Sequence, residues 1–523
     1  MHILSRRLRF WPALAVCALA SACTGDPAPS ASGDPAGTSM VIAIADEPVS
    51  VHPLAGYAEH GAAKVFDGLL EHRANLSLRP ALAVEPPEPA PDGKSWTARL
   101  REGITFSDGT ALDAADVVAT YRALLDPAYA SPVRQRFWML TGIRQLDART
   151  VRFDLNRPYA AFPQLLVLGI VPSEALAKPG PVTESGPPPA GTGPYRVTEW
   201  SPGQRMVLEA NKSYFDGPPA ITKVTVEFLP DDDARARRMR DGKLDGAALP
   251  PALARTFEGA DGLRVVAHSA ADLHAIALPA GEPVTGDPAL RLALNYGVNR
   301  KALVDGVLGG KGTEASTPMP EALAEFVEPT AKFPYDVTRA LDLLAEAGWL
   351  PGADGMRAKA GVPARFTLLY RSGDTLARDL ASAFATGAKG IGIQVSAEAA
   401  DADTLLTRST KDAVLFGFGN PFDPDLYLYQ LLHSSADGRL AANPTIDAAL
   451  DTGRTATDPA QRATAYRKLQ RTYLTAPSMV VLAAPQHTYV LRETWNGYEP
   501  VIDAQDPDFT WGAWWNVHKW TPR

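Results

Sequence analysis

The stretch at residues 415–425 groups aromatic rings around an amide, and such side chains can contact a small molecule by packing and hydrogen bonding, without covalent chemistry. It reads Leu-Phe-Gly-Phe-Gly-Asn-Pro-Phe-Asp-Pro-Asp, so Phe416, Phe418 and Phe422 flank one amide, Asn420. A neutral amide can accept a hydrogen bond, but it cannot offset the charge of a desolvated cation. The alternative is that the three rings belong to the core, as large apolar side chains commonly do.

Catalytic motifs do not occur in the sequence. There is no Gly-x-Ser-x-Gly nucleophile elbow and no His-Glu-x-x-His zinc motif. His268 and His274 stand six residues apart, a spacing that does not predict a preformed metal site. We therefore expect no enzyme activity, no metal site and no cofactor. A secreted hydrolase stays open as an alternative, which turnover of ester or glycoside substrates would support.

A strand, a turn and a helix are predicted between Trp96 and Pro127. Trp96, Ala98 and Leu100 fall on one face at period two, which is typical of a strand. Asp113 can then cap a helix, with Asp116 three residues on where the acid of a capping box belongs. Asp126-Pro127 ends the helix, because the residue before a proline avoids helical backbone angles.

Further elements follow from periodicity. A buried first strand is predicted at 40–45, and alternating strands at 150–155, 196–200, 204–211 and 221–228. An amphipathic helix is expected over 335–349. A strand at 366–370, a helix at 376–388 and a strand at 391–395 predict a right-handed parallel crossover. The region 276–484 is thus interpreted as an α/β lobe.

The run W-T-x-R-L-R-x-G-I-x-F-x-D-G-T-x-L-x-A-x-D-V that begins at Trp96 resembles the signature of family 5 extracellular solute-binding proteins. These proteins deliver oligopeptides, dipeptides, nickel chelates and related solutes to ABC importers. The run Gly-Thr-Gly-Pro-Tyr at 191–195 resembles a second hallmark, and residues 290–307 resemble a helix of the family. The resemblance covers about residues 40 to 520.

The resemblance implies an α/β fold: a two-lobed periplasmic-binding-protein-like clamp with mixed sheets, which closes on its solute. The first lobe would comprise 40–275 plus 485–523, enlarged by an extra subdomain at about 80–190, and the second lobe 276–484. The implied partners are an ABC permease and its ATPase subunits, and the implied function is capture and delivery of a peptide-like or related small solute. A scaffold lipoprotein with the same fold stays open.

The resemblance also indicates which residues contact the solute. In peptide-binding members, the residue three before the Asp-Pro pair is an aspartate that binds the peptide ammonium; here it is Asn420. In the branch that binds nickel chelates and opine-type metallophores, Phe418 and Phe422 would take the places of a tryptophan and a tyrosine. Arg136 and Trp138 resemble the arginine and tryptophan of that branch. Its second arginine has no counterpart before Pro172-Ser173, so the solute stays open.

Two more regions complete the candidate site. Tyr57 and His60 follow the turn at 52–54, where the family has a loop of the cleft, and Asp503 lies in its terminal segment beside the cleft. Each candidate has an ordinary alternative: Trp138 as packing, and Arg136 and His60 as solvated surface groups. The tryptophans near the C-terminus are interpreted as packing of a final strand onto the first lobe: Trp511, Trp514, Trp515 and Trp520.

The first 22 residues are interpreted as a lipoprotein signal peptide. Three arginines precede an apolar stretch that, at about 13 residues, is shorter than the roughly 20 needed to span a bilayer. The sequence Leu-Ala-Ser-Ala-Cys ending at Cys23 resembles a lipobox, whose cysteine carries the lipid. Residues 23–39 would then be a flexible tether. The expected location is the extracytoplasmic face of the cell membrane, by Sec or twin-arginine export.

Charge excludes one class of partner. The 523 residues carry a formal net charge of −8, and removing residues 1–22, with three arginines and no acid, takes it to −11. A nucleic-acid partner demands a basic face, so none is expected.

Overall fold

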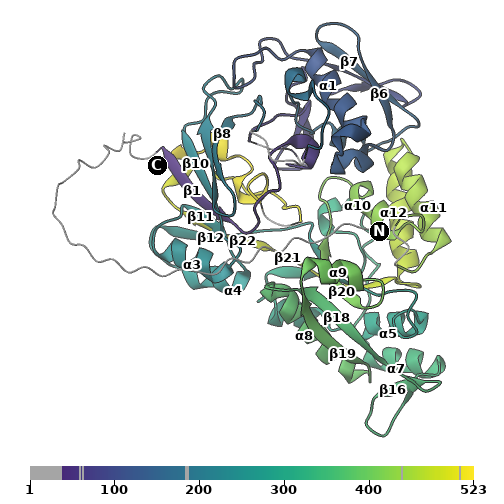
Figure 1. The fold of residues 1–523 in the computed structure, drawn as a ribbon. Helices are drawn as coiled ribbons and strands as arrows, with labels where there is room; N and C mark the ends of the chain where they lie inside the picture. The colour runs from purple at the N-terminus through teal and green to yellow at the C-terminus, as the bar shows by residue number, and fades with distance from the viewer. Residues whose placement is uncertain (1–37, 58–60, 62–63, 183–187, 437–439, 506–507) are drawn as a thin grey trace, which may run out of the picture. The chain divides into compact units, whose positions relative to one another are not determined.

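A computed structural model describes residues 38–57, 61, 64–182, 188–436, 440–505 and 508–523 (Figure 1). Two of the predicted functional residues, Cys23 and His60, lie outside the described residues. Most of the described strands belong to two large mixed sheets and one smaller antiparallel sheet.

The first large sheet is built mainly from the N-terminal half of the chain. The predicted first strand is confirmed as β1 (Ser39–Ile44), which pairs in parallel with β10 (Lys223–Phe228) and β11 (Gly246–Ala248). One strand, β22, comes from the C-terminal part and inserts between β11 and β12. The remaining strands are β8 (Tyr195–Ser201), β9 (Arg205–Ala210), β12 (Leu263–His268) and β22 (His487–Arg492). Helices α3 (Asp232–Arg240) and α4 (Pro251–Ala254) lie beside β11 and β12 (Figure 1).

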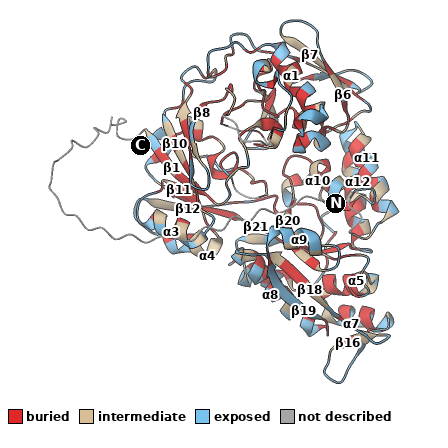
Figure 2. Ribbon diagram, viewed as in Figure 1, coloured by how far each residue is buried: buried red, intermediate tan, exposed pale blue. Residues whose placement is uncertain are grey.

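The second large sheet has six strands in the order β14-β21-β13-β20-β18-β19. The predicted parallel crossover is confirmed: β18 (Arg365–Arg371) and β19 (Gln394–Ala400) pair in parallel, joined by α8 (Thr375–Gly390). Residues such as Leu380 and Phe384 bury one side of α8 against the sheet, while its outer side is exposed (Figure 2). The other strands are β13 (Leu273–Ala277), β14 (Gly312–Glu314), β20 (Ala413–Phe418) and β21 (Met479–Pro485).

Helices flank this sheet, and one of them departs from the sequence prediction. The helix expected at 290–307 is two helices, α5 (Pro288–Gly297) and α6 (Arg300–Gly306). Val298 has an extended ψ of 123°, and the Asn299 side chain accepts a hydrogen bond from the Ala302 amide at 3.0 Å, which caps α6. Asparagine competes with the helix backbone in this way, so it starts a new helix here. The amphipathic helix is confirmed as α7 (Val337–Glu346).

The smaller sheet has the order β4-β5-β7-β6 and packs against α1 (Ala114–Leu125). Its strands are β4 (Glu88–Pro89), β5 (Ser95–Arg99), β6 (Leu140–Gln145) and β7 (Thr150–Leu155). The predicted capping box is confirmed. The side chain of Asp113 accepts a hydrogen bond from backbone amides of the first turn, and the side chain of Asp116 accepts one from the amide of Asp113. The buried ring of Tyr121 on α1 meets Phe153 of β7 edge-on at 4.8 Å, which ties helix and sheet together.

Three further helices pack around a third hydrophobic core beside β20: α10 (Asp425–Leu432), α11 (Pro444–Thr455) and α12 (Pro459–Tyr473). Helix α9 (Ala402–Arg408) instead contacts β18. The C-terminal tryptophans Trp514 and Trp520 are buried, as predicted, in the hydrophobic core that also holds residues of β1, β10 and α1. They do not come from a long strand, however, because 512–514 and 517–519 are short 3-10 helices and the last strand is only Thr521–Pro522.

Candidate functional site

The candidate site is centred on the turn that follows β20. Gly419 has φ of +140°, and a Cβ there would lie 1.7 Å from the carbonyl oxygen of Ala271, so only glycine fits. The next residue, Asn420, is 3% exposed. Its Oδ1 accepts hydrogen bonds from the amides of Phe422 at 2.8 Å and Asp423 at 3.4 Å. The asparagine side chain therefore shapes the turn as well as lining it.

The two acids of this turn are already paired with arginines. Both carboxylate oxygens of Asp423 lie 2.9 Å from Nη2 of Arg462. Asp425 lies 2.9 and 3.1 Å from Nε of Arg454. All four side chains are buried, and a buried charge is stable only with such a partner. Neither acid is therefore available to a cationic solute.

The region of the small sheet reaches this turn through two aromatic residues. The hydroxyl of Tyr159 donates to Oδ2 of Asp425 at 2.6 Å. The guanidinium carbon of Arg454 lies 4.5 Å from the ring centroid of Trp138, which meets Tyr159 edge-on at 5.4 Å. Arg136 is half-buried in the 3-10 helix Pro132–Phe137, just before Trp138. The structure thus brings Trp138 together with the turn, through an arginine that the sequence had not indicated.

The three phenylalanines lie in apolar clusters. Phe416 and Phe418 stack at 5.2 Å on one face of β20, within the third core. Phe422 stacks on the imidazole of His72 at 3.6 Å and meets Trp511 edge-on at 5.3 Å. This packing fits the core alternative. Contact between these rings and a solute stays a prediction.

Asp503 belongs to a buried chain of acids and histidines where the polypeptide passes between the two large sheets. Its carboxylate lies 2.8 Å from Nδ1 of His268 and 3.1 Å from Nδ1 of His487. Asp272 in turn lies 3.4 Å from Nε2 of His487 and 3.1 Å from Nε2 of His274. The passages β12 to β13 and β21 to β22 lie side by side here, because His268 pairs with His487. We call these five residues the hinge cluster.

Opposite charges fix the protonation of the hinge cluster. Burial by itself lowers the pKa of His487, but its hydrogen bonds to Asp272 and Asp503 outweigh this and raise the pKa to about 10. Burial would raise the pKa of Asp503, yet hydrogen bonds from His268 and His487 hold it below the usual value. The spacing of the histidines gave no sign of this arrangement. Only the alternation that puts Asp272 and His274 on one face of a strand could have indicated part of it.

The remaining candidate, Tyr57, is buried with its hydroxyl unpartnered among the described residues. Burial, and next the charge of Asp508, raise its pKa well above the usual value. A buried hydroxyl without a partner is uncommon in proteins, so this group is a candidate contact for a bound polar group. Its role in binding stays a prediction.

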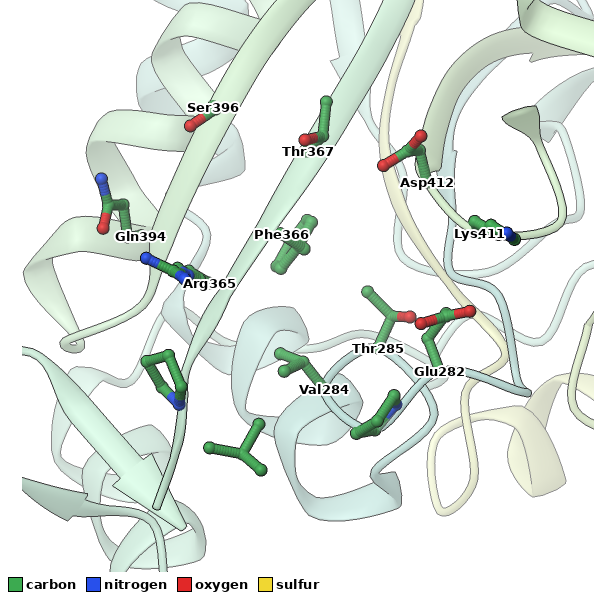
Figure 3. Close-up of a pocket in the computed structure, with 13 residues that line it drawn as sticks. Glu282, Val284, Thr285, Arg365, Phe366, Thr367, Gln394, Ser396, Lys411 and Asp412 are labelled. Atoms are coloured by element: carbon green, nitrogen blue, oxygen red, sulfur yellow. The ribbon is translucent and has the colours of Figure 1, made fainter.

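Two open cavities lie away from all of these residues. One, of about 620 Å³, lies on the second large sheet and is lined by both polar and apolar side chains (Figure 3). Arg365 and Thr367 project from β18, Gln394 and Ser396 from β19, and Glu282 from the opposite wall. The other, of about 1220 Å³, lies between residues 47–52 and residues 175–182 and 188–189, beside Trp200. None of the predicted site residues lines either cavity.

The described residues contain no group of three or more histidine, cysteine, aspartate or glutamate side chains placed to hold a metal ion. None of the helices within the described ranges is both long enough and apolar enough to cross a bilayer.

Comparison with known proteins places the chain in a class. The family model "Bacterial extracellular solute-binding proteins, family 5 Middle" matches residues 77–439. Protein XP55 of Streptomyces lividans is 42% identical over 514 residues, 96% of this chain and 94% of that protein. The oligopeptide-binding protein AppA of Bacillus subtilis (strain 168) is 25% identical over 538 residues, 96% and 95% of the two chains. NikZ from Campylobacter jejuni, solved in complex with Ni(L-His), superposes with a TM-score of 0.84 at 25% identity, over 93% of this chain and 99% of NikZ.

Fold and sequence therefore agree on a two-lobed α/β binding protein with mixed sheets. The chain belongs to the family 5 extracellular solute-binding proteins of ABC transporters, which are extracytoplasmic, non-enzymatic substrate carriers.

Proposed function

We propose that this protein captures a peptide-like or related small solute between its two lobes and delivers it to an ABC permease. The observation that carries the proposal is the turn after β20. There, Asp425 at the start of α10 and Arg454 of α11 meet Tyr159 and Trp138 from the small-sheet region. A solute held at such a junction would favour closure of the lobes, because it binds the closed state better than the open one.

The lobes are proposed as 40–275 plus 485–523, with an extra subdomain at about 80–190, and 276–484. The topology supports this division, because β22 joins the first large sheet while β21, just before it, joins the second. Lipid modification of Cys23 is proposed to hold the protein on the outer face of the membrane, with residues 23–39 as the tether.

A nickel chelate or opine-type metallophore is the second candidate solute. The likeness to NikZ, whose structure contains Ni(L-His), favours it. The pairing of Asp423 and Asp425 with arginines is compatible with either solute, since neither acid remains to bind a cation.

Mass spectrometry of the solute that co-purifies with the protein tests the proposal, because mass and metal content separate a peptide from a chelate. Peptide or chelate added to solute-free protein should raise the melting temperature, by mass action on the folded state. As a control, Gln394→Ala alters only the exposed cavity of Figure 3 and should leave the shift unchanged. Absence of any shift with peptides and chelates would point instead to a scaffold protein.

A further inference from the structure

One residue of the hinge cluster, His487, contacts acids on both sides of the connections between the two large sheets. Its Nδ1 lies 3.1 Å from a carboxylate oxygen of Asp503, and its Nε2 lies 3.4 Å from a carboxylate oxygen of Asp272. Asp503 is tied to the first sheet, because it also bonds His268 at the end of β12. Asp272 immediately precedes β13 of the second sheet. His487 therefore bridges one acid from each side.

The hydrogen-bond partners require His487 to carry a positive charge. A neutral imidazole donates from one nitrogen only, whereas both nitrogens of His487 face carboxylates, which accept hydrogen bonds when ionised. Asp503 also accepts hydrogen bonds from His268 and from the hydroxyl of Tyr489. Against the effect of burial, the two acids raise the pKa of His487 to about 10, and the histidines lower the pKa of both acids. The bridge is therefore charged at neutral pH.

The other histidine bonded to Asp503 does not need a charge. The titratable groups around His487 come from β12, β13, β22 and the C-terminal segment: Asp272, His274, His268, Tyr489, Tyr498 and Asp503. The Nε2 of His268 lies 2.6 Å from the hydroxyl of Tyr498, which can donate, so a neutral His268 satisfies both of its partners. The guanidinium of Arg264 lies beyond, 4.4 Å from the ring centroid of Tyr498. Among the histidines of the cluster, His487 is the one that joins two carboxylates.

The proposed lobes also contact each other away from the hinge cluster. The hydroxyl of Tyr159 donates to Asp425 at 2.6 Å, and Nη2 of Arg371 lies 3.2 Å from Asp46. Each pair joins a residue of 40–275 to a residue of 276–484. The bridge through His487 is therefore made while the lobes are in contact. A rotation of one lobe against the other would move the two connections, because a hinge absorbs such motion in a few residues.

We propose that His487 is a charged latch at the hinge, which holds the protein in the arrangement with its lobes in contact. This rests on the proposed division into two lobes, but not on the identity of the solute. Loss of the proton leaves one donor for two acids, so one side of the bridge breaks and the charge between the acids disappears. The lobes then separate more readily. His487 is a positioning residue, because it acts on the lobes through the connections.

Small-angle X-ray scattering of the solute-free native protein tests the latch over a series of pH values from neutral to alkaline. The radius of gyration should stay constant near neutral pH and increase as the pH rises through about 10, where His487 loses its proton. Circular dichroism at each pH shows whether the secondary structure is kept. This titration needs no variant, so it tests the inference even where a substitution impairs folding.

His487→Gln removes the charge at a similar side-chain volume. The amide of glutamine has a donor end and an acceptor end, so it can donate to one of the two acids but not to both. This variant should have the larger radius of gyration already at neutral pH and should not expand further as the pH rises. His268→Gln is the matched control, because glutamine can donate to Asp503 and accept from Tyr498 as a neutral histidine does. It should stay compact at neutral pH and expand at the same pH as the native protein.

Four outcomes would overturn the latch. One is a radius of gyration of the native protein that stays constant through pH 10 while the protein remains folded. Another is expansion of His487→Gln at the same pH as the native protein, because a different group would then titrate. Expansion of both glutamine variants at neutral pH removes the distinction between the two histidines. Loss of secondary structure together with the expansion means that the chain unfolds instead of opening at its hinge.

The proposed carrier function is tested separately, by the solute that co-purifies with the protein. A solute found in a protein that does not expand would leave the carrier function standing without the latch. Expansion that depends on His487, in a protein that binds neither peptides nor chelates, would leave the latch standing without the carrier function.

Discussion

At the scale of single residues, the acids in and near the predicted site are already paired with basic side chains of this chain. Asp423, Asp425 and Asp503, which stand in or near the predicted site, each contact a basic side chain or a histidine of this chain. Removing one partner of a buried pair is costly, because it leaves an uncompensated charge away from water. The arginines are therefore expected to matter for stability as well as for the shape of the turn.

Arg454→Met tests this expectation. Methionine has a similar volume but no charge, so Asp425 would keep only the hydroxyl of Tyr159. The free energy of unfolding should fall by about 3 kcal/mol, as for other broken buried pairs, measured by urea denaturation.

The matched control is Arg378→Met. Arg378 contacts Asp379 in a pair whose side chains are 55% and 51% exposed. Exposed pairs contribute little, so the loss should stay below about 1 kcal/mol. Equal losses in the two variants would contradict a buried ion pair at Asp425.

At the scale of elements, the hinge cluster contacts both connections between the two large sheets, from β12 to β13 and from β21 to β22. Their stability therefore depends on the protonation of its histidines. Asp272 precedes β13, His268 ends β12 and His487 begins β22, so one buried network contacts both passages. His487 has a pKa raised to about 10 between two acids whose pKa values are lowered. Its stabilising charge is therefore fully present below the ordinary histidine pKa of 6.5 and is lost as pH rises from there toward 10.

We predict that stability falls between pH 6.5 and 10 through this group, by at most about 1.4 kcal/mol per pH unit for one proton. Lys64 opposes the trend, because burial lowers its pKa to about 7 and stability then rises with pH above that value. Urea denaturation of the native protein and of His487→Gln at several pH values isolates the histidine. The difference between the two proteins should shrink as pH rises, and a constant difference would contradict the assignment.

At the scale of the whole molecule, the proposed lipid anchor would decide where the protein works. Cys23 is one of only two cysteines, and Cys17 lies within the predicted signal peptide. Lipid on Cys23 would keep the carrier close to its permease, which raises the local concentration of captured solute there.

Cys23→Ser should therefore abolish incorporation of labelled palmitate and move the protein out of the membrane fraction. Cys17→Ser is the matched control and should leave both unchanged, because that residue would be removed with the predicted signal peptide. Membrane-bound, labelled protein in the Cys23→Ser variant would contradict lipidation at this position.

The sequence by itself determined the parts of this protein that depend on near neighbours. The capped helix after Asp113, the crossover from β18 to β19 and the buried first strand follow from periodicity and capping within short stretches. The family, too, was evident from the run that begins at Trp96, and the family model confirms it.

Only the tertiary structure decided what surrounds the candidate residues. Tyr159 and Asp425 are 266 residues apart and His268 and Asp503 are 235 apart, yet each pair is hydrogen-bonded. No local pattern encodes such pairings, because they depend on how separate sheets and loops come together. The same physics explains Asn420: its residue type was visible in the sequence, but which of its two polar ends is used by the protein depends on the backbone folded around it.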